Sequence, residues 1–154
     1  MTEKQFSDRV RFCAARLYRI SYLILGREAD CEDAVQETLL RAWRRIGTLR
    51  QPEYFETWLI RILINESRRM LKERARHPSG EIPESMPAVQ PPDPALRDAV
   101  LALDARFRVP VILHHLEGYR VNEIAGMLNL PVTTVKHRLR RGRELLKIQL
   151  GEEE

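Results

Sequence analysis

Basic side chains gather near the C-terminus at a spacing that one helix could present to a ligand. Residues 136 to 147 include six Lys and Arg side chains and a single acid, Glu144. Guanidinium and ammonium groups donate hydrogen bonds to phosphates and to guanine O6 and N7, and threonine contacts phosphates or the thymine methyl group. This excess of positive charge favours a DNA-binding helix over a solvated helix without a ligand. The candidate residues are Thr133, Thr134, Lys136, His137, Arg140 and Arg141, with Arg138 expected nearer the DNA backbone.

The residues around the start of this segment have the spacing of a helix-turn-helix. Ala125 stands where two helices approach closely, Asn129 follows four residues later and Val135 ten residues later. The turn position requires a positive φ, and asparagine is the best-suited residue there after glycine. The pattern predicts helices over 121–128 and 132–149, of which the second would enter the major groove of DNA.

Residues for catalysis or metal binding do not stand together in this sequence. Cys13, Cys31 and the four histidines are not at metal-ligand spacings, and neither a Ser/His/Asp set nor a Gly-rich phosphate loop is present. We therefore expect no enzymatic activity, metal, cofactor or small-molecule substrate. Without a secretory start, the two cysteines are expected to be reduced thiols in a cytosol. No hydrophobic run approaches the ~20 residues that span a bilayer.

Charge and proline content divide the 154-residue chain into two blocks and a bridge. Residues 1–76 have a net charge of +5, residues 77–94 of −3 and residues 95–150 of +5. The bridge has six of the nine prolines, so neither a helix nor a strand is expected in it. With 44% hydrophobic residues, the chain can form two small domains. We expect these domains at 1–76 and 95–154, joined by a semi-extended linker at 77–94.

Hydrophobic residues outside the bridge repeat at helical spacing, which predicts an all-α fold. The expected architecture is an N-terminal helical bundle and a C-terminal four-helix domain that includes the helix-turn-helix. Trp43 and Trp58 fall on hydrophobic faces and are expected in the core. The sequence leaves open whether Pro110 lies in the first turn of its helix or in its interior. The remaining predicted helices are 5–25, 31–46, 52–76, 95–104 and 105–117.

Three segments resemble parts of the bacterial sigma factors, which are subunits of RNA polymerase. The segment GYRVNEIAGMLNLPVTTVKHRLRRGRELL (118–146) resembles their region-4 helix-turn-helix. The segments DCEDAVQETLLRAWRRI (30–46) and PEYFETWLIRILINESRRMLKERAR (52–76) resemble their region 2. The order of these blocks, with only a short linker between them, resembles the extracytoplasmic-function group. The resemblance covers the chain from about residue 5 to 150.

This resemblance implies a subunit that binds core RNA polymerase and directs it to promoter DNA. The −35 element would be read by the helix-turn-helix, and the −10 element would be read and opened by region 2. The implied polymerase-binding face lies opposite the hydrophobic stripe of helix 31–46, and we expect it to be free to bind: Asp33, Gln36, Glu37, Leu40 and Arg41. The implied −10-binding residues are Arg61, Asn65, Arg68 and Arg69.

Two places in the sequence affect how DNA would be read. The loop at 47–56 resembles the segment that captures a flipped base, where Tyr54 and Phe55 would either stack on the base or pack into the core. Thr133 and His137 depart from the usual residues of the family's region 4 and stand at groove-facing positions. They therefore change the chemistry available for the −35 sequence.

The resemblance also implies partners and a compartment. An anti-sigma factor is expected, often at the membrane, and the chain itself is expected in the bacterial cytoplasm without forming a stable homo-oligomer. The alternative is a stand-alone helix-turn-helix regulator. Such regulators usually dimerise on palindromes, but the sequence has no heptad seam, and the first block would have no role.

Overall fold

The computed structural model describes residues 1–76 and 93–151, and all regular elements in these ranges are helices. The predicted all-α fold class is therefore confirmed. The chain divides into two compact units, Met1–Val89 and Gln90–Glu154. The expected linker at 77–94 lies outside the described residues except for its last two, Asp93 and Pro94.

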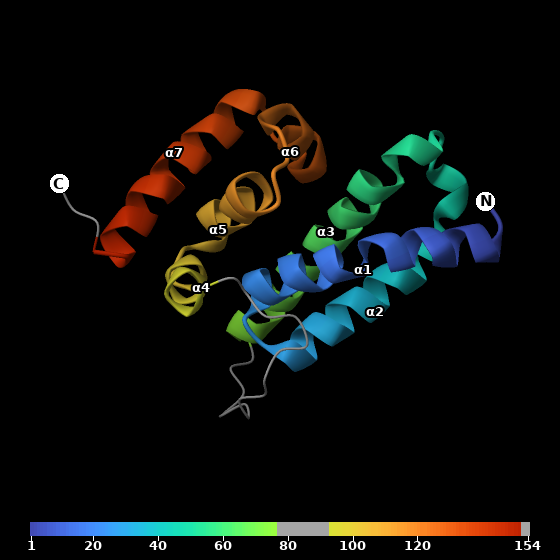
Figure 1. Cartoon of the computed structure of the whole chain (residues 1–154), viewed down its shortest axis with the longest axis horizontal. Helices are drawn as coiled ribbons and strands as arrows, with labels where there is room; N and C mark the ends of the chain where they lie inside the picture. The colour runs from blue at the N-terminus through green and yellow to red at the C-terminus, as the bar shows by residue number, and fades with distance from the viewer. Residues whose placement is uncertain (77–92, 152–154) are drawn as a thin grey trace. The chain divides into compact units, whose positions relative to one another are not determined.

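Over residues 1–76, the first unit has three long helices and two short 3₁₀ turns (Figure 1). The α2 and α3 helices pack on each other, and both pack on α1. The helices are α1 (Glu3–Leu25), α2 (Glu28–Arg44) and α3 (Phe55–Arg76), and the turns between α2 and α3 are Ile46–Thr48 and Pro52–Tyr54.

Local sequence signals define both ends of α1. Thr2 caps the start, because its hydroxyl accepts a hydrogen bond from the Gln5 backbone at 3.1 Å while the Gln5 side chain accepts one from the Thr2 backbone at 2.9 Å. Gly26 ends the helix in the left-handed conformation with φ 73°, as the sequence predicts.

The core of the first unit is mostly aliphatic, with Leu17, Ile20 and Leu59 fully buried. Trp43 is not part of this core. It is 41% exposed, so the prediction that it is buried is wrong. Trp43 lies in the last turn of α2 and makes an edge contact with Phe6 of α1, at 5.2 Å between ring centroids.

An arginine joins the ends of the three helices at the opposite end of the bundle. Arg74, near the end of α3, donates to the Leu25 carbonyl at 2.9 Å and forms an ion pair with Asp30 of α2. This side chain therefore stabilises the bundle, although it belongs to the run of basic residues in the second half of α3.

The second unit contains the remaining helices, and Asp93 caps the first of them. Pro94, which composition assigns to the linker, is the first helical residue of the unit. The elements are α4 (Pro94–Leu101), α5 (Ala105–Val111), a π-helical turn (Ile112–Leu116), α6 (Val121–Leu128) and α7 (Val132–Gln149).

Pro110 lies in the interior of α5, which resolves the choice that the sequence leaves open. Proline cannot donate to the carbonyl of the preceding turn. The helix continues into the wider π turn, where the Glu117 N–H bonds to the carbonyl of Ile112 at 3.0 Å, five residues earlier.

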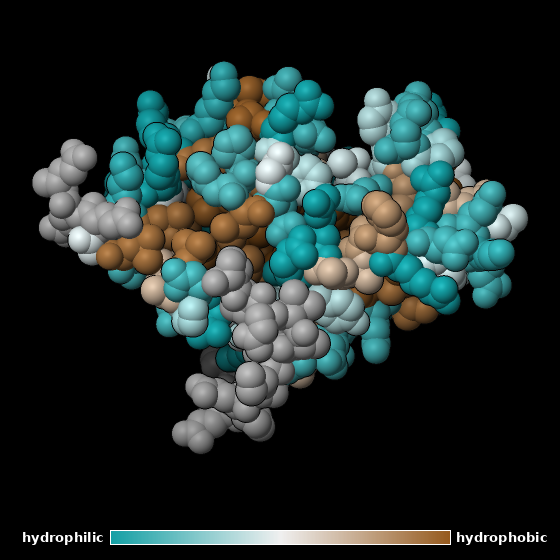
Figure 2. All heavy atoms as spheres, in the orientation of Figure 1, coloured by the Kyte–Doolittle hydropathy of each residue, from teal (hydrophilic) through white to brown (hydrophobic). Residues whose placement is uncertain are grey.

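The surface is mostly polar, and on the face shown in Figure 2 hydrophobic residues gather along α4, α5 and α7. Two large hydrophobic side chains near the end of α7 are exposed, Ile148 and Leu150. In the part of the chain that the structure describes, no helix combines the length and the hydrophobicity that a membrane span requires.

Candidate nucleic-acid interface

The predicted helix-turn-helix is formed by α6 and α7. Asn129 ends α6 with φ 55° and ψ 49°, which is the left-handed conformation that the spacing predicts. Its turn is closed by the Leu130 N–H, which donates to the Ala125 carbonyl at 3.0 Å. Ile124 and Val135 are fully buried where the two helices pack. This packing fixes the direction in which α7 leaves the turn.

Five of the seven candidate residues of α7 lie on the side that does not face the core, and the other two lie at the edge of the buried side. Thr133, Lys136, His137, Arg140 and Arg141 are exposed, and Thr134 and Arg138 are half-buried. The opposite side of α7 is buried through Val135, Leu139 and Gly142. Of the seven side chains, Arg141 alone has an ion pair within the described residues, with Glu144 at 3.1 Å. The face is therefore positively charged and largely available for phosphates and base edges.

The four candidate residues of α3 also share one helix face. Arg61, Asn65 and Arg69 are exposed and Arg68 is half-buried, while Leu59 and Leu63 on the other side are fully buried. Arg69 differs from the others because two carboxylates hold it. Its Nε lies 2.9 Å from Glu66 Oε1, and its Nη1 lies 3.0 Å from Glu73 Oε2.

The candidate residues of α2 are only partly free, which corrects the expectation from the sequence. Asp33 and Gln36 are exposed, and Leu40 is 53% exposed. Arg41 instead turns toward its own helix and α3. Its Nε lies 3.0 Å from Glu37 Oε1 and 3.3 Å from a carboxylate of α3.

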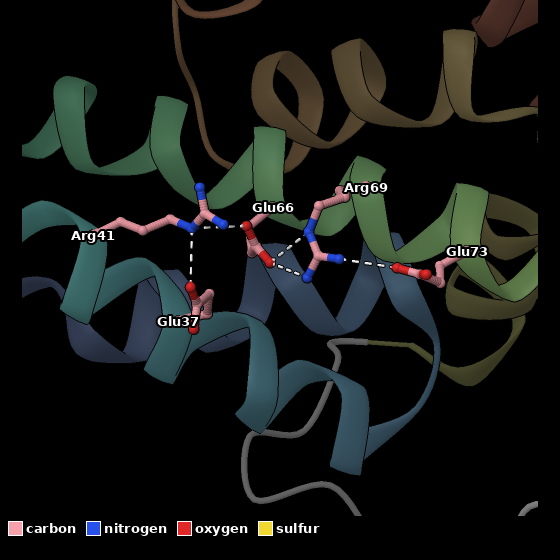
Figure 3. Close-up of polar contacts among 5 residues, drawn as sticks. All are labelled: Glu37, Arg41, Glu66, Arg69 and Glu73. Atoms are coloured by element: carbon pink, nitrogen blue, oxygen red, sulfur yellow. Dashed lines mark hydrogen bonds and ion pairs between the residues drawn. The ribbon is translucent and has the colours of Figure 1, made fainter.

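That carboxylate belongs to Glu66, which links the two candidate surfaces (Figure 3). Its Oε2 pairs with Arg41 and its Oε1 with Arg69, while its side chain is only 3% exposed. The sequence analysis missed Glu66. The available signals were the i,i+4 spacing of Glu37 and Arg41 and the i,i+3 spacing of Glu66 and Arg69, which indicate pairs within one helix but not the link between helices.

A hydrophobic groove of about 520 Å³ lies beside the α2 candidates. Leu39, Leu40 and Trp43 of α2 and Phe6 of α1 line it, together with Gln36. Sequence reasoning missed this groove because it placed Trp43 in the core. Exposed aromatic and aliphatic side chains bordered by polar ones are typical of protein-binding surfaces.

The two aromatic residues of the loop at 47–56 have different environments. Phe55 is 4% exposed and packs between Phe6, at 5.7 Å, and Trp58, at 6.0 Å between ring centroids. Phe55 is therefore a core residue. Tyr54 is 57% exposed, so its ring is the one of the two that can stack on a ligand.

The two cysteines and His114 make contacts inside their own units. Burial raises the pKa of both the Cys13 and the Cys31 thiols to about 11. Cys31 Sγ lies 2.7 Å from Ser21 Oγ, and His114 Nδ1 lies 2.9 Å from the Tyr119 carbonyl oxygen. Over residues 1–76 and 93–151, no group of three or more His, Cys, Asp or Glu side chains is arranged to hold a metal ion.

Comparison with protein families gives two matches in this chain. Residues 10–77 match the model of Sigma-70 region 2, and residues 94–146 match that of Sigma-70, region 4. Together they include the three candidate surfaces.

Individual proteins similar to the chain are named as sigma factors. The ECF RNA polymerase sigma factor SigE of Mycolicibacterium smegmatis is 33% identical over 95% of this chain, which spans 62% of that protein's length. The RNA polymerase sigma-H factor of Pseudomonas aeruginosa is 30% identical over 76% of this chain and 71% of its own length. The sigma factor RpoE of Bartonella quintana, solved in complex with the anti-sigma factor NepR, superposes with a TM-score of 0.82 and 25% identity over 98% of this chain and 99% of that one.

Proposed function

The chain belongs to the sigma-70 family, in its extracytoplasmic-function group, and on that premise we propose that it directs core RNA polymerase to promoters and starts transcription there. The observation that carries the proposal is the pairing of two structures in one chain. A helix-turn-helix with an exposed basic face in the second unit accompanies separate polar faces on α2 and α3 of the first unit. A stand-alone regulator would have no use for the first unit.

The second unit reads the −35 element in this proposal. Lys136, Arg140 and Arg141 donate to guanine acceptors or phosphates, and Thr133 and Thr134 contact thymine methyl groups or phosphates. Thr133 and His137 give this face its own base preference. Each well-made bidentate contact discriminates against a wrong base by about 1–3 kcal/mol.

The first unit binds polymerase and opens the −10 element. Asp33, Gln36 and Leu40 form the polymerase-binding face, which the neighbouring groove extends through Trp43. The hydrophobic side chains of the groove supply contact area that loses its water on binding, whereas Asp33 and Gln36 supply directional polar contacts.

The α3 face and the preceding loop then hold the separated strand. Arg61, Asn65 and Arg68 face the DNA, and Tyr54 offers a ring on which an extruded base can stack. Base stacking on an aromatic side chain is worth about 1–3 kcal/mol, comparable to the cost of extruding a base.

A protein partner is part of the proposal. The relative from Bartonella quintana was solved with an anti-sigma factor, and CnrH, a structural neighbour, was solved with the cytosolic domain of CnrY. We expect an anti-sigma factor to hold this chain inactive in the cytoplasm or at the membrane. As in the rest of the family, we expect the subunit to have no catalytic role of its own and to act without a cofactor.

Transcription from a pool of random promoters tests the proposal. Core bacterial polymerase is mixed with the chain, and the transcripts are sequenced. We expect start sites with two conserved elements at a fixed spacing, which appear only when the chain is present. Palindrome binding without polymerase, together with no transcription, would refute the proposal and favour a stand-alone regulator.

A further inference from the structure

Arg69 is held by its acidic neighbours in a way that leaves part of its hydrogen-bonding capacity unused. A guanidinium has five N–H donors. In the described structure three of these are used: the Nε and Nη2 groups bond to Glu66 Oε1, and the Nη1 group bonds to Glu73 Oε2 (Figure 3). Two N–H groups remain, one on Nη1 and one on Nη2, which is the number needed for a bidentate contact with a base edge.

Glu66 is itself fixed, so it can orient Arg69 precisely. Its side chain is 3% exposed, and its second oxygen accepts a charge-assisted contact from Arg41 at 3.3 Å. Arg41 is fixed in turn by Glu37 at 3.0 Å. A carboxylate with a partner at each oxygen has little freedom to rotate, so it also restricts the orientation of the guanidinium bonded to it.

The same cluster also neutralises the charge of Arg69. Three carboxylates, from Glu37, Glu66 and Glu73, surround the two guanidinium groups of Arg41 and Arg69. The hydrogen bonds to Glu66 and, second, the negative charge of Glu66 raise the pKa of Arg69. The guanidinium therefore remains protonated, while the nearby carboxylates compensate its positive charge. General attraction to DNA depends on uncompensated positive charge, whereas sequence reading depends on oriented donors.

We propose that Glu66 is a positioning residue that converts Arg69 from a phosphate-binding charge into a reader of base sequence in the −10 element. This inference rests on the proposed function, because it requires the α3 face to meet promoter DNA. Glu66 does not touch the DNA. It acts by holding Arg69 with two donors free and with its charge compensated.

The experiment measures holoenzyme binding over a series of salt concentrations. The probes are a fluorescent duplex chosen by transcription from the random pool and the same duplex with its −10 segment shuffled. The variants are Glu66→Gln, which removes the charge at nearly constant shape, and Arg69→Ala at an exposed position. Asp8→Asn is the control, because it removes one negative charge from an exposed position of α1 outside the cluster.

The expected results differ from those of simple loss of structure. Glu66→Gln leaves Arg69 with Glu73 as its remaining carboxylate partner, so its charge is less fully compensated. The variant should therefore bind the shuffled duplex more tightly, with a slope of log K against log salt that is steeper by at most about 0.7–0.9. Discrimination between the two duplexes should fall about tenfold in Glu66→Gln and in Arg69→Ala. Arg69→Ala should leave the salt slope nearly unchanged, because its charge is already cancelled. Asp8→Asn should keep wild-type discrimination.

Several outcomes would overturn this inference. One is a Glu66→Gln protein that discriminates between the two duplexes as well as wild type does and has the same salt slope. Another is a Glu66→Gln protein that binds both duplexes more weakly by the same factor. If Glu66→Gln does not fold, the test rests on Arg69→Ala. A salt slope shallower than wild type by about 0.7–0.9, the value for one phosphate contact, would show that Arg69 binds a phosphate through its charge and would overturn the inference. The proposed function fails separately, when wild-type holoenzyme itself does not distinguish the two duplexes, and the inference then falls with it.

Discussion

The contact between α5 and α7 leaves no space for a methyl group at Gly142. A Cβ added there would lie 2.7 Å from Val111 Cγ2 and 3.5 Å from Phe107 Cβ. Val111 is 1% exposed, and a β-branched side chain in a helix has one strongly preferred rotamer, so it cannot turn aside. Inserting a methyl group into a packed core costs about 1–3 kcal/mol, which opposes the ~1 kcal/mol that alanine gains over glycine in a helix. Gly142→Ala should therefore lose up to about 2 kcal/mol of unfolding free energy.

Gly126 provides a matched control in the same unit. It lies inside α6, and a Cβ added there meets nothing within 4 Å. Gly126→Ala should therefore stabilise the unit by up to about 1 kcal/mol. The difference between the two variants cancels the shared gain in helix propensity and isolates the steric clash with Val111, which we expect to be about 1–3 kcal/mol.

Hydrogen exchange followed by mass spectrometry measures this difference in the full chain. Peptides from α5 and α7 report the opening free energy of the second unit without interference from the first. We expect faster exchange in Gly142→Ala and slower exchange in Gly126→Ala. Equal protection in the two variants would refute the reasoning, because it would show that α5 and α7 are not in close contact at Gly142.

Three further predictions concern the turn, a helix cap and the thiols. Asn129→Ala should lower the unfolding free energy by about 1 kcal/mol because alanine disfavours the left-handed conformation, whereas Asn129→Gly should not, as thermal unfolding can show. Asp104 caps α5 through the Arg106 backbone N–H, and that bond lowers its pKa. The stabilisation is therefore present at neutral pH and lost as pH falls through the lowered pKa. Denaturant titrations should show that Asp104→Ala has an unfolding free energy about 1 kcal/mol below wild type at pH 7, and that this difference disappears in acid. Cys13 and Cys31, with pKa values raised to about 11, should react slowly with a disulfide reagent at pH 8 and quickly once urea unfolds the chain; rapid reaction in the native state would contradict their burial.

The helix-turn-helix could be predicted because its signals are local. Asn129 adopts the left-handed conformation, since the turn demands a positive φ that glycine or asparagine tolerates best. The spacing of Ile124, Val135 and Leu139 determines which sides of α6 and α7 are buried, and the structure buries all three. Nothing outside residues 118–146 is needed for these conclusions.

Features that depend on a neighbouring helix could not be predicted in the same way. Periodicity places Trp43 on the hydrophobic stripe of α2, but its burial depends on where α1 covers that stripe, and the contact with Phe6 leaves Trp43 41% exposed. In the same way, the sequence shows Arg41 beside Glu37 within one helix. It does not show that Arg41 also meets Glu66 from α3, because that contact depends on the packing of the two helices.

The central claim is that the two units read separate elements of one promoter, and variant-specific promoter selection tests it most directly. Random promoters are transcribed by holoenzyme containing wild type, Lys136→Ala in α7 or Asn65→Ala in α3, and the selected sequences are compared. We predict that Lys136→Ala changes base preference only in the upstream element and that Asn65→Ala changes it only in the downstream element. The account would be contradicted if both variants altered the same element, or if the selected promoters were identical with and without the chain.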